Sequence, residues 1–145
     1  MTFRSGVLMV GLAAAAVVPV PAVADAGPVP QADYTASATR WMSAWNITDP
    51  DRRLEVLASV FAPDGRYINP LFTAVGPEQI NARIGEQLRM NPGFYQSVSG
   101  QVFTYGRSAA FRWEMASPSV HHGGWDGAAY DEHGMVTQMV GGFDH

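Results

Sequence analysis

The chain of 145 residues contains no cysteine and no lysine. Without cysteine it can form neither a disulfide bond nor a lipid-modified cysteine, so packing alone must stabilise the fold. Without lysine, arginine is the only strongly basic residue, and the nine arginines are scattered along a chain of formal net charge −4. A nucleic-acid-binding surface needs clustered positive charge, so we expect no nucleic-acid partner.

Residues 1–26 have the pattern of a secretory signal peptide. Arg4 supplies the positive start, residues 7–18 form an apolar core, and small residues offer cleavage after Ala24 or Ala26. The apolar core is shorter than the roughly 20 residues that span a bilayer. Cleavage is therefore expected, and an uncleaved anchor is the alternative.

The rest of the chain reads as a proline-rich flexible linker at residues 27–33 and a single domain at residues 34–145. The exclusive use of arginine, together with abundant alanine and glycine, suggests a bacterial origin. We expect a secreted or periplasmic protein with no membrane partner after cleavage.

Three helices are predicted first. One helical face carries apolar residues at matching spacing: Tyr34, Ala38, Trp41, Met42 and Trp45. A second helix begins at Asp49-Pro50, a capping residue followed by proline, and the turn-like residues 63–65 are expected to end it. Its apolar stripe is Leu54, Leu57, Ala58 and Phe61. The third helix runs from Gly76 to the stop at Asn91-Pro92-Gly93, with Ile80, Ile84 and Leu88 on one side.

The remaining segments have strand patterns. They are a short strand at 66–70 and longer ones at 94–105, 108–116, 120–130 and 135–143. A hairpin turn is expected at 131–134. Helices followed by an antiparallel series of strands predict an α+β domain in which the helices cover one face of a curved sheet.

Asp126 is the candidate functional residue of this pattern. It lies in a strand-like run, residues 125–130, that contains no other charge and adjoins segments rich in tryptophan, phenylalanine and methionine. Burial there makes a carboxyl group costly to ionise. Asp126 is therefore a neutral hydrogen-bond donor to a ligand, a base with a raised pKa, or a structural partner of a backbone amide or an arginine.

The order of these features resembles the nuclear-transport-factor-2-like superfamily, and within it the SnoaL-like group. The segments that carry the resemblance are 41–46, 58–65, 67–70, the helix from Gly76, Arg112-Trp113, Trp125-Asp126 and 142–144. The resemblance implies a cone with three N-terminal helices packed on a curved, mainly antiparallel sheet, and a pocket at its wide end. It does not imply one reaction, because the fold supports many functions.

Comparison with ketosteroid isomerases, which resemble this chain, argues against their mechanism. The resemblance places their protonated aspartate on Asp126, their general base on Asn69 and their oxyanion-hole tyrosine on Trp41. An amide side chain is not basic enough to accept a substrate proton. Asn69 is therefore expected either in the pocket wall or as a strand-end residue that hydrogen-bonds the turn beside Pro70.

The second comparison, with limonene epoxide hydrolases, gives the same result. Arg112 and Glu114 are similar to the arginine–acid pair of that enzyme, but Gly141 replaces the aspartate of the last strand. If Trp113 faces the core, its two neighbours face outward, which favours a solvated ion pair between Arg112 and Glu114. Neither enzyme's water- or proton-activating base is present.

Family position and strand alternation together predict the pocket walls. The expected ligand-binding residues are Trp41, Trp45, Tyr67, Asn69, Trp113, Met115, Tyr130, Met139 and Phe143, with Gly141 leaving room. Aromatic and methionine side chains suit a flat hydrophobic ligand. Ordinary core packing is the alternative for each of them.

Histidines and cofactor motifs add little. His121 and His122 point to opposite faces of a strand and cannot share a metal ion, so we expect no metal site, and no motif indicates another cofactor. His122 has the strand parity of Asp126 and is a second candidate catalytic residue, as a base that reaches the cavity.

The sequence therefore predicts an exported SnoaL-like protein with an apolar pocket for a small hydrophobic molecule, polycyclic ones included. Asp126 is the polar anchor, for binding or for isomerase- or lyase-type chemistry. The alternative is a non-catalytic interaction module that has a filled pocket and forms a homodimer through the outer face of the sheet.

Overall fold

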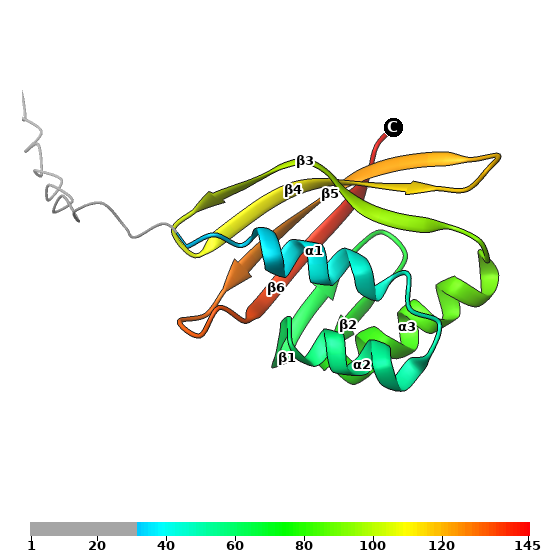
Figure 1. Ribbon diagram of the computed structural model, residues 1–145. Helices are drawn as coiled ribbons and strands as arrows, with labels where there is room; N and C mark the ends of the chain where they lie inside the picture. The colour runs from blue at the N-terminus through cyan, green and yellow to red at the C-terminus, as the bar shows by residue number, and fades with distance from the viewer. Residues whose placement is uncertain (1–31) are drawn as a thin grey trace, which may run out of the picture.

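The computed structural model describes residues 32–145, in which three helices lie on one face of a six-stranded sheet (Figure 1). The helices are α1 (Thr35–Ala44), α2 (Pro50–Ala58) and α3 (Gly76–Met90). The strands are β1 (Phe61–Ile68), β2 (Thr73–Val75), β3 (Tyr95–Tyr105), β4 (Ser108–Ala116), β5 (His121–Tyr130) and β6 (Val136–Phe143). The expected signal peptide and nearly all of the expected linker lie outside the described residues.

The strand order across the sheet is β2-β1-β6-β5-β4-β3. Only β1 and β6 pair in parallel, and the other neighbours are antiparallel. The predicted α+β class with a curved, mainly antiparallel sheet is confirmed. None of the helices in residues 32–145 is long and apolar enough to cross a membrane.

Helix α1 packs against the sheet through the predicted apolar face, on which Ala38 and Trp41 are completely buried. Asn46, just after this helix, fixes the helix to the first residues of β3. Its side chain donates to the Gln96 carbonyl and accepts from the Gln96 N–H, with both distances 2.7 Å. The C-terminal end of α1 and the start of β3 are thereby joined.

Helix α2 begins as predicted but ends earlier. Asp49 Oδ1 accepts a hydrogen bond from the Arg52 N–H at 2.8 Å, and Pro50 occupies the first turn. The helix ends at Ala58, so the predicted continuation to Phe61 and the predicted turn at residues 63–65 are wrong.

Residues 61–68 instead form β1, which pairs with β6. The register between these strands shifts between Phe61 and Arg66, where a bulge accommodates Pro63. Gly65 is required in this bulge, because a Cβ atom there would lie 2.5 Å from the Val136 carbonyl oxygen. Long-range pairing therefore overrides the local turn signal.

Strands β3 to β6 lie within one or two residues of their predicted ranges. The hairpin between β5 and β6 is formed as expected: Asp131 Oδ1 accepts from the N–H groups of His133 and Met135, and Gly134 has a φ of 76°. The short strand β2, which pairs with β1, has no counterpart among the predicted elements.

Candidate active site

Three successive rows of side chains cross the inner face of the sheet. The first contains Asp126 on β5, opposite Gly141 on β6. The second contains Trp113, Gly124 and Phe143, and the third contains Gln96, Met115 and His122. Side chains two residues apart on a strand point to the same face, so all three rows face the same cavity.

Asp126 is buried at the deep end, with 1% of its surface exposed. Its Oδ2 accepts a hydrogen bond from Trp41 Nε1 at 2.7 Å, whereas Oδ1 is buried without a partner among the described residues. Burial raises the pKa of Asp126 to about 7, against the opposing effect of the Trp41 and Trp113 indole groups. Because Oδ2 accepts the hydrogen bond from Trp41, the proton of the neutral carboxyl group lies on Oδ1.

Tyr67 on β1 supplies a second polar group beside Asp126. Its hydroxyl oxygen accepts from Asn69 Nδ2 at 3.2 Å, which leaves the hydroxyl proton available for donation. Burial, followed by the negative charge of Asp126, raises the pKa of Tyr67, so the phenol stays protonated. Strand pairing between distant segments, rather than any local motif, brings this phenol to the acid.

Asn69 both hydrogen-bonds the turn after β1 and lines the cavity, the two alternatives that the sequence offered. Its Oδ1 accepts from the N–H groups of Leu71 and Phe72, each at 2.9 Å, and so holds the turn after β1. Its amide nitrogen meanwhile points at Tyr67 and lines the cavity. The turn therefore positions the amide that orients the phenol.

Gly141 creates the space between the two polar groups. A Cβ atom at this position would lie 2.3 Å from Asp126 Oδ1 and 2.8 Å from the Tyr67 hydroxyl. Both oxygens therefore occupy the place that a side chain at this position would take, and only glycine lets them lie side by side. This is the room that family position had assigned to Gly141.

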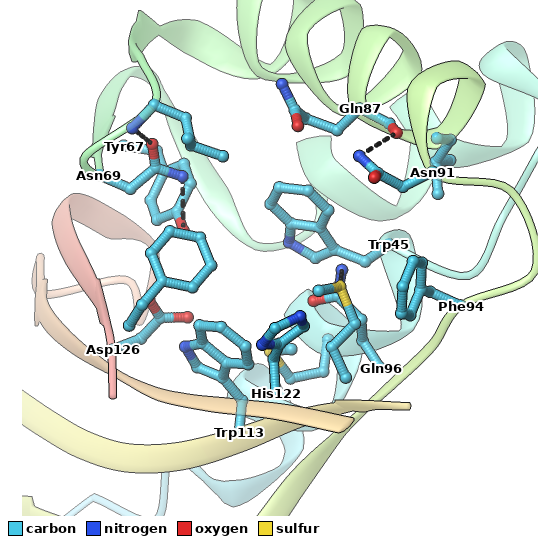
Figure 2. A pocket seen from close by; sticks show the side chains of 15 residues that line it. Trp45, Tyr67, Asn69, Gln87, Asn91, Phe94, Gln96, Trp113, His122 and Asp126 are labelled. Atoms are coloured by element: carbon cyan, nitrogen blue, oxygen red, sulfur yellow. Dashed lines mark hydrogen bonds between the residues drawn. The ribbon is translucent and has the colours of Figure 1, made fainter. Parts of the chain in front are cut away.

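The cavity has a volume of about 160 Å³ and its walls are mostly aromatic and aliphatic (Figure 2). Eight of the predicted site residues line it: Trp45, Tyr67, Asn69, Trp113, Met115, His122, Asp126 and Phe143. The remaining seven lining residues were missed: Met42, Leu71, Gln87, Leu88, Asn91, Phe94 and Gln96. Gln87 and Asn91, four residues apart on one side of the third helix, were the available signal for the missed wall.

Three predicted wall residues do not line the cavity. Trp41 lies behind Asp126, completely buried, and holds the carboxyl instead of facing a ligand. Met139 is also completely buried in the core, and the Tyr130 ring stacks on Tyr34 with centroids 3.7 Å apart. Strand parity was correct for Tyr130 and Met139, but the helices cover that end of the sheet.

The adjacent histidines point to opposite faces, as expected. His122 lines the cavity, whereas His121 Nε2 lies 2.7 Å from Glu114 Oε2 on the outer face. Within residues 32–145, no group of three metal-ligating side chains comes together.

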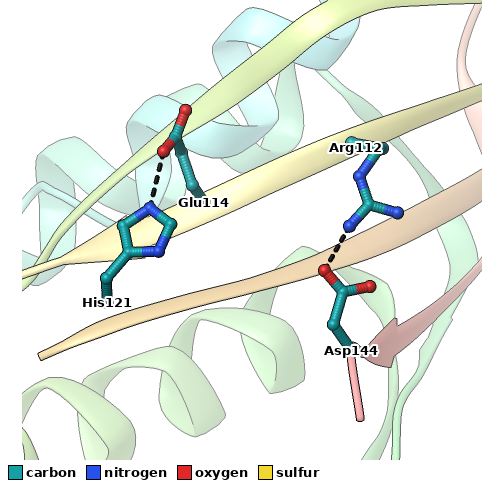
Figure 3. Close-up of polar contacts among 4 residues, drawn as sticks. All are labelled: Arg112, Glu114, His121 and Asp144. Atoms are coloured by element: carbon teal, nitrogen blue, oxygen red, sulfur yellow. Dashed lines mark hydrogen bonds and ion pairs between the residues drawn. The ribbon is translucent and has the colours of Figure 1, made fainter.

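Arg112 and Glu114 lie on the outer face, away from the helices (Figure 3). They do not pair with each other as predicted: Arg112 pairs with Asp144, and Glu114 pairs with His121. Each partner comes from another part of the sheet: Asp144 follows β6, and His121 begins β5.

The site is an apolar cavity with two adjacent oxygen groups at one end. Comparison with known proteins identifies the family of the chain. A family description for the SnoaL-like domain matches residues 38–138. The chain belongs to the SnoaL-like family. No curated protein gives a significant match to this SnoaL-like chain.

Solved structures agree with this assignment. An isomerase candidate of the SnoaL-like family from Agrobacterium tumefaciens is 28% identical, with a TM-score of 0.72, covering 77% of this chain and 97% of its own. A ketosteroid isomerase candidate from Kribbella flavida is 19% identical, with a TM-score of 0.59, covering 76% of each chain. A SnoaL-like polyketide cyclase candidate from a Jannaschia species is 18% identical, with a TM-score of 0.55, covering 65% and 74%. The last two support the fold alone, and the predicted cone fold is confirmed.

Proposed function

We propose that this SnoaL-like domain binds a small apolar molecule through a carbonyl oxygen, which accepts hydrogen bonds from protonated Asp126 and from Tyr67. The observation that carries the proposal is that the Asp126 Oδ1 and the Tyr67 hydroxyl lie together against Gly141, on residues that line the cavity. A buried polar atom without a partner, such as Oδ1, is costly unless a ligand satisfies it. The aromatic walls supply the apolar contact area.

Binding fits the residues better than the ketosteroid isomerase mechanism. The position of the proton-accepting base is Asn69, whose amide hydrogen-bonds the turn and Tyr67. His122 lies two rows away from Asp126 on the same strand, roughly 13 Å along the backbone, which is too far to act on the same ligand atom. Of the two candidate catalytic residues, Asp126 is assigned here as an anchor and His122 as part of the cavity wall.

Acetophenone, a simple aromatic ketone, tests the proposal in an NMR titration of the full-length chain that follows the four indole N–H signals. Signals of Trp41, Trp45 and Trp113 should shift, while Trp125, which is half exposed on the outer face, serves as an internal control. Tyr67→Phe should weaken binding about threefold to tenfold, the contribution of one hydrogen bond.

Asp126→Asn tests whether Asp126 binds the ligand as a neutral donor or as an anion. The amide can still accept a hydrogen bond from Trp41 and donate one to a ketone, but it cannot ionise. In the unmodified chain, affinity should be constant below a pH of about 7 and fall above it as Asp126 ionises. The Asn variant should keep its affinity and lose this decline. Affinity that rises with pH through the same range would show that the anion binds, and would reject the donor role.

A second candidate function, assembly with a second copy of the chain, is favoured by the outer face of the sheet. Phe103 and Trp125 are 63% and 46% exposed there, and the outward-facing positions between them carry Ala110 and Gly127. We call these four residues the outer-face patch. The charged groups nearby are already paired within the chain, so a second copy could cover the patch without burying an unpaired charge.

We also propose that the chain is exported, on the basis of the signal-like residues 1–26. N-terminal sequencing of protein recovered from the periplasm or medium should then begin at Asp25 or Gly27. A protein that keeps Met1 in the cytoplasm would contradict export.

A further inference from the structure

The cavity has polar groups at both ends and an apolar sheet side between them, whereas Gln87 and Asn91 add polar groups from the α3 side. The deep end holds Asp126, Tyr67 and Asn69, whereas Gln96 lies at the opposite end with Phe94 beside it (Figure 2). Between the two ends, the indole of Trp113 lies over Gly124, where a Cβ atom would come within 2.2 Å of the ring. The cavity is therefore elongated, with hydrogen-bonding groups separated by an aromatic section.

The strand register sets how far apart the two polar rows lie along the strands. Met115 pairs with Gln96 on one side and with His122 on the other, so these three residues form one row across β3, β4 and β5. His122 and Asp126 are four residues apart on one strand, which separates the two polar rows by about 13 Å. Gln96 lies two strands across the sheet from the Asp126 strand, so the two polar groups stand diagonally opposite each other.

The far row offers an acceptor for a hydroxyl group. Gln96 Nε2 donates to Met115 Sδ at 3.6 Å, which leaves the amide oxygen of Gln96 to accept from a ligand. The backbone of Gln96 is held on both sides by Asn46, so its side chain starts from a fixed point. His122 provides a second nitrogen or N–H group in the same row.

The volume limits the width of the ligand. A cavity of roughly 150 Å³ in another protein holds a single benzene molecule. The volume here is about 160 Å³, which matches one six-membered ring with small substituents. Drug-sized and polycyclic ligands occupy pockets of about 300–1,000 Å³.

We propose that the ligand is a single-ring molecule with a carbonyl group at one end and a hydroxyl group at the other. The carbonyl meets Asp126 and Tyr67, the ring lies against Trp113 and Trp45, and the hydroxyl donates to Gln96. This inference rests on the proposed carbonyl-binding function and narrows the expected ligand from a small hydrophobic molecule, polycyclic ones included, to a single ring.

Three probes of graded shape test the inference on the full-length chain by the same indole NMR titration. They are acetophenone, para-hydroxyacetophenone, and testosterone, which carries a ketone and a hydroxyl at the ends of four fused rings. Para-hydroxyacetophenone should bind about threefold to tenfold more tightly than acetophenone, the effect of one added hydrogen bond. Testosterone should leave the Trp45 and Trp113 signals unmoved.

Gln96→Met tests whether the tighter binding of para-hydroxyacetophenone comes from the row that contains Gln96. It should reduce the affinity ratio of the two single-ring probes toward one, and His122→Phe probes the same row from β5. Gln138→Met, on an exposed residue outside the cavity, is the matched control and should preserve the ratio.

The outcomes separate the two proposals. Testosterone binding as tightly as the single-ring probes, or a ratio unchanged in Gln96→Met, would overturn the inference. If acetophenone binds and depends on Tyr67 while the hydroxyl adds nothing, the inference fails and the carbonyl-binding function stands. If no probe shifts the cavity indoles, both proposals fail.

Discussion

The Asp126 carboxyl links the chemistry of the cavity to the stability of the domain. Among the described residues it accepts one hydrogen bond, from Trp41, and it is almost completely buried, so the ionised form is poorly solvated. A chain that keeps such a group at the deep end of a cavity accepts a cost at neutral pH. Ligand binding is the physical reason we offer for that cost.

The first prediction is a stability that falls as pH rises. The pKa of Asp126 is raised from 3.8 to about 7 on folding, so the folded state binds more protons than the unfolded state between these values. The stabilisation is complete below a pH of about 4 and is lost as the pH approaches 7, on the order of 4 kcal/mol at most. Urea unfolding at a series of pH values measures it.

Asp126→Asn is the control for this prediction, because the amide resembles the protonated carboxyl and does not titrate. The contribution of Asp126 to the decline between pH 4 and 7 should disappear in the variant. An equal decline in both proteins would assign it to other groups.

The second prediction concerns Gly141. In Gly141→Ala the added methyl group meets Asp126 Oδ1 and Tyr67, so we expect a loss of about 1–3 kcal/mol in unfolding free energy and loss of acetophenone binding. Gly127→Ala is the matched control, because no atom lies within 4 Å of a Cβ placed there. Its stability should be unchanged or slightly raised. Equal effects of the two substitutions on binding would contradict the role of Gly141.

At the scale of elements, the link between α1 and β3 positions the far row of the cavity. Asn46 satisfies both backbone groups of Gln96, although the two residues come from different layers of the fold. Contacts of this kind hold the helical layer in register with the sheet. They also determine where the Gln96 side chain begins.

The third prediction follows from this link. Asn46→Ala leaves both backbone groups of Gln96 without their partner and should lower the unfolding free energy by about 1–3 kcal/mol, measured by urea unfolding. Asn91→Ala removes only a 3.3 Å bond at an exposed helix end, and its effect should stay within about 0.5 kcal/mol. A smaller loss for Asn46→Ala than for Asn91→Ala would show that the link contributes little.

At the scale of the whole molecule, the two faces of the sheet differ in what they contact. The inner face and the helices enclose the cavity, whereas the outer face carries the outer-face patch and two ion pairs (Figure 3). Ligand binding and assembly therefore use separate surfaces and can be tested independently.

The fourth prediction is a dimer that depends on the outer-face patch. Light scattering coupled to size-exclusion chromatography should give twice the chain mass, and Trp125→Arg should give a monomer, because the charge would be buried against the second copy. Met90→Arg, on a more exposed residue at the end of α3, should leave the mass unchanged. A monomeric unmodified chain would reject assembly through this face.

Several features of the fold and site were predictable from local patterns. The apolar face of α1, the capped start of α2 and the strands from Tyr95 onward follow from spacing, capping and alternation, which are properties of neighbouring residues. Alternation also placed Asp126 and Trp113 on the inner face. The end of α2 was not predictable, because the pairing of β1 with β6 outweighs the turn preference of residues 63–65.

The sequence by itself determined eight of the fifteen residues of the cavity wall and the isolation of Asp126 among apolar neighbours in its strand. Tertiary structure alone decided that Tyr67 lies beside Asp126 and that Gln96 faces both from the far row, because these residues meet only through pairing of distant strands. It also decided that Trp41 holds the carboxyl from behind. The volume and length of the cavity depend on such long-range packing, which local periodicity does not specify.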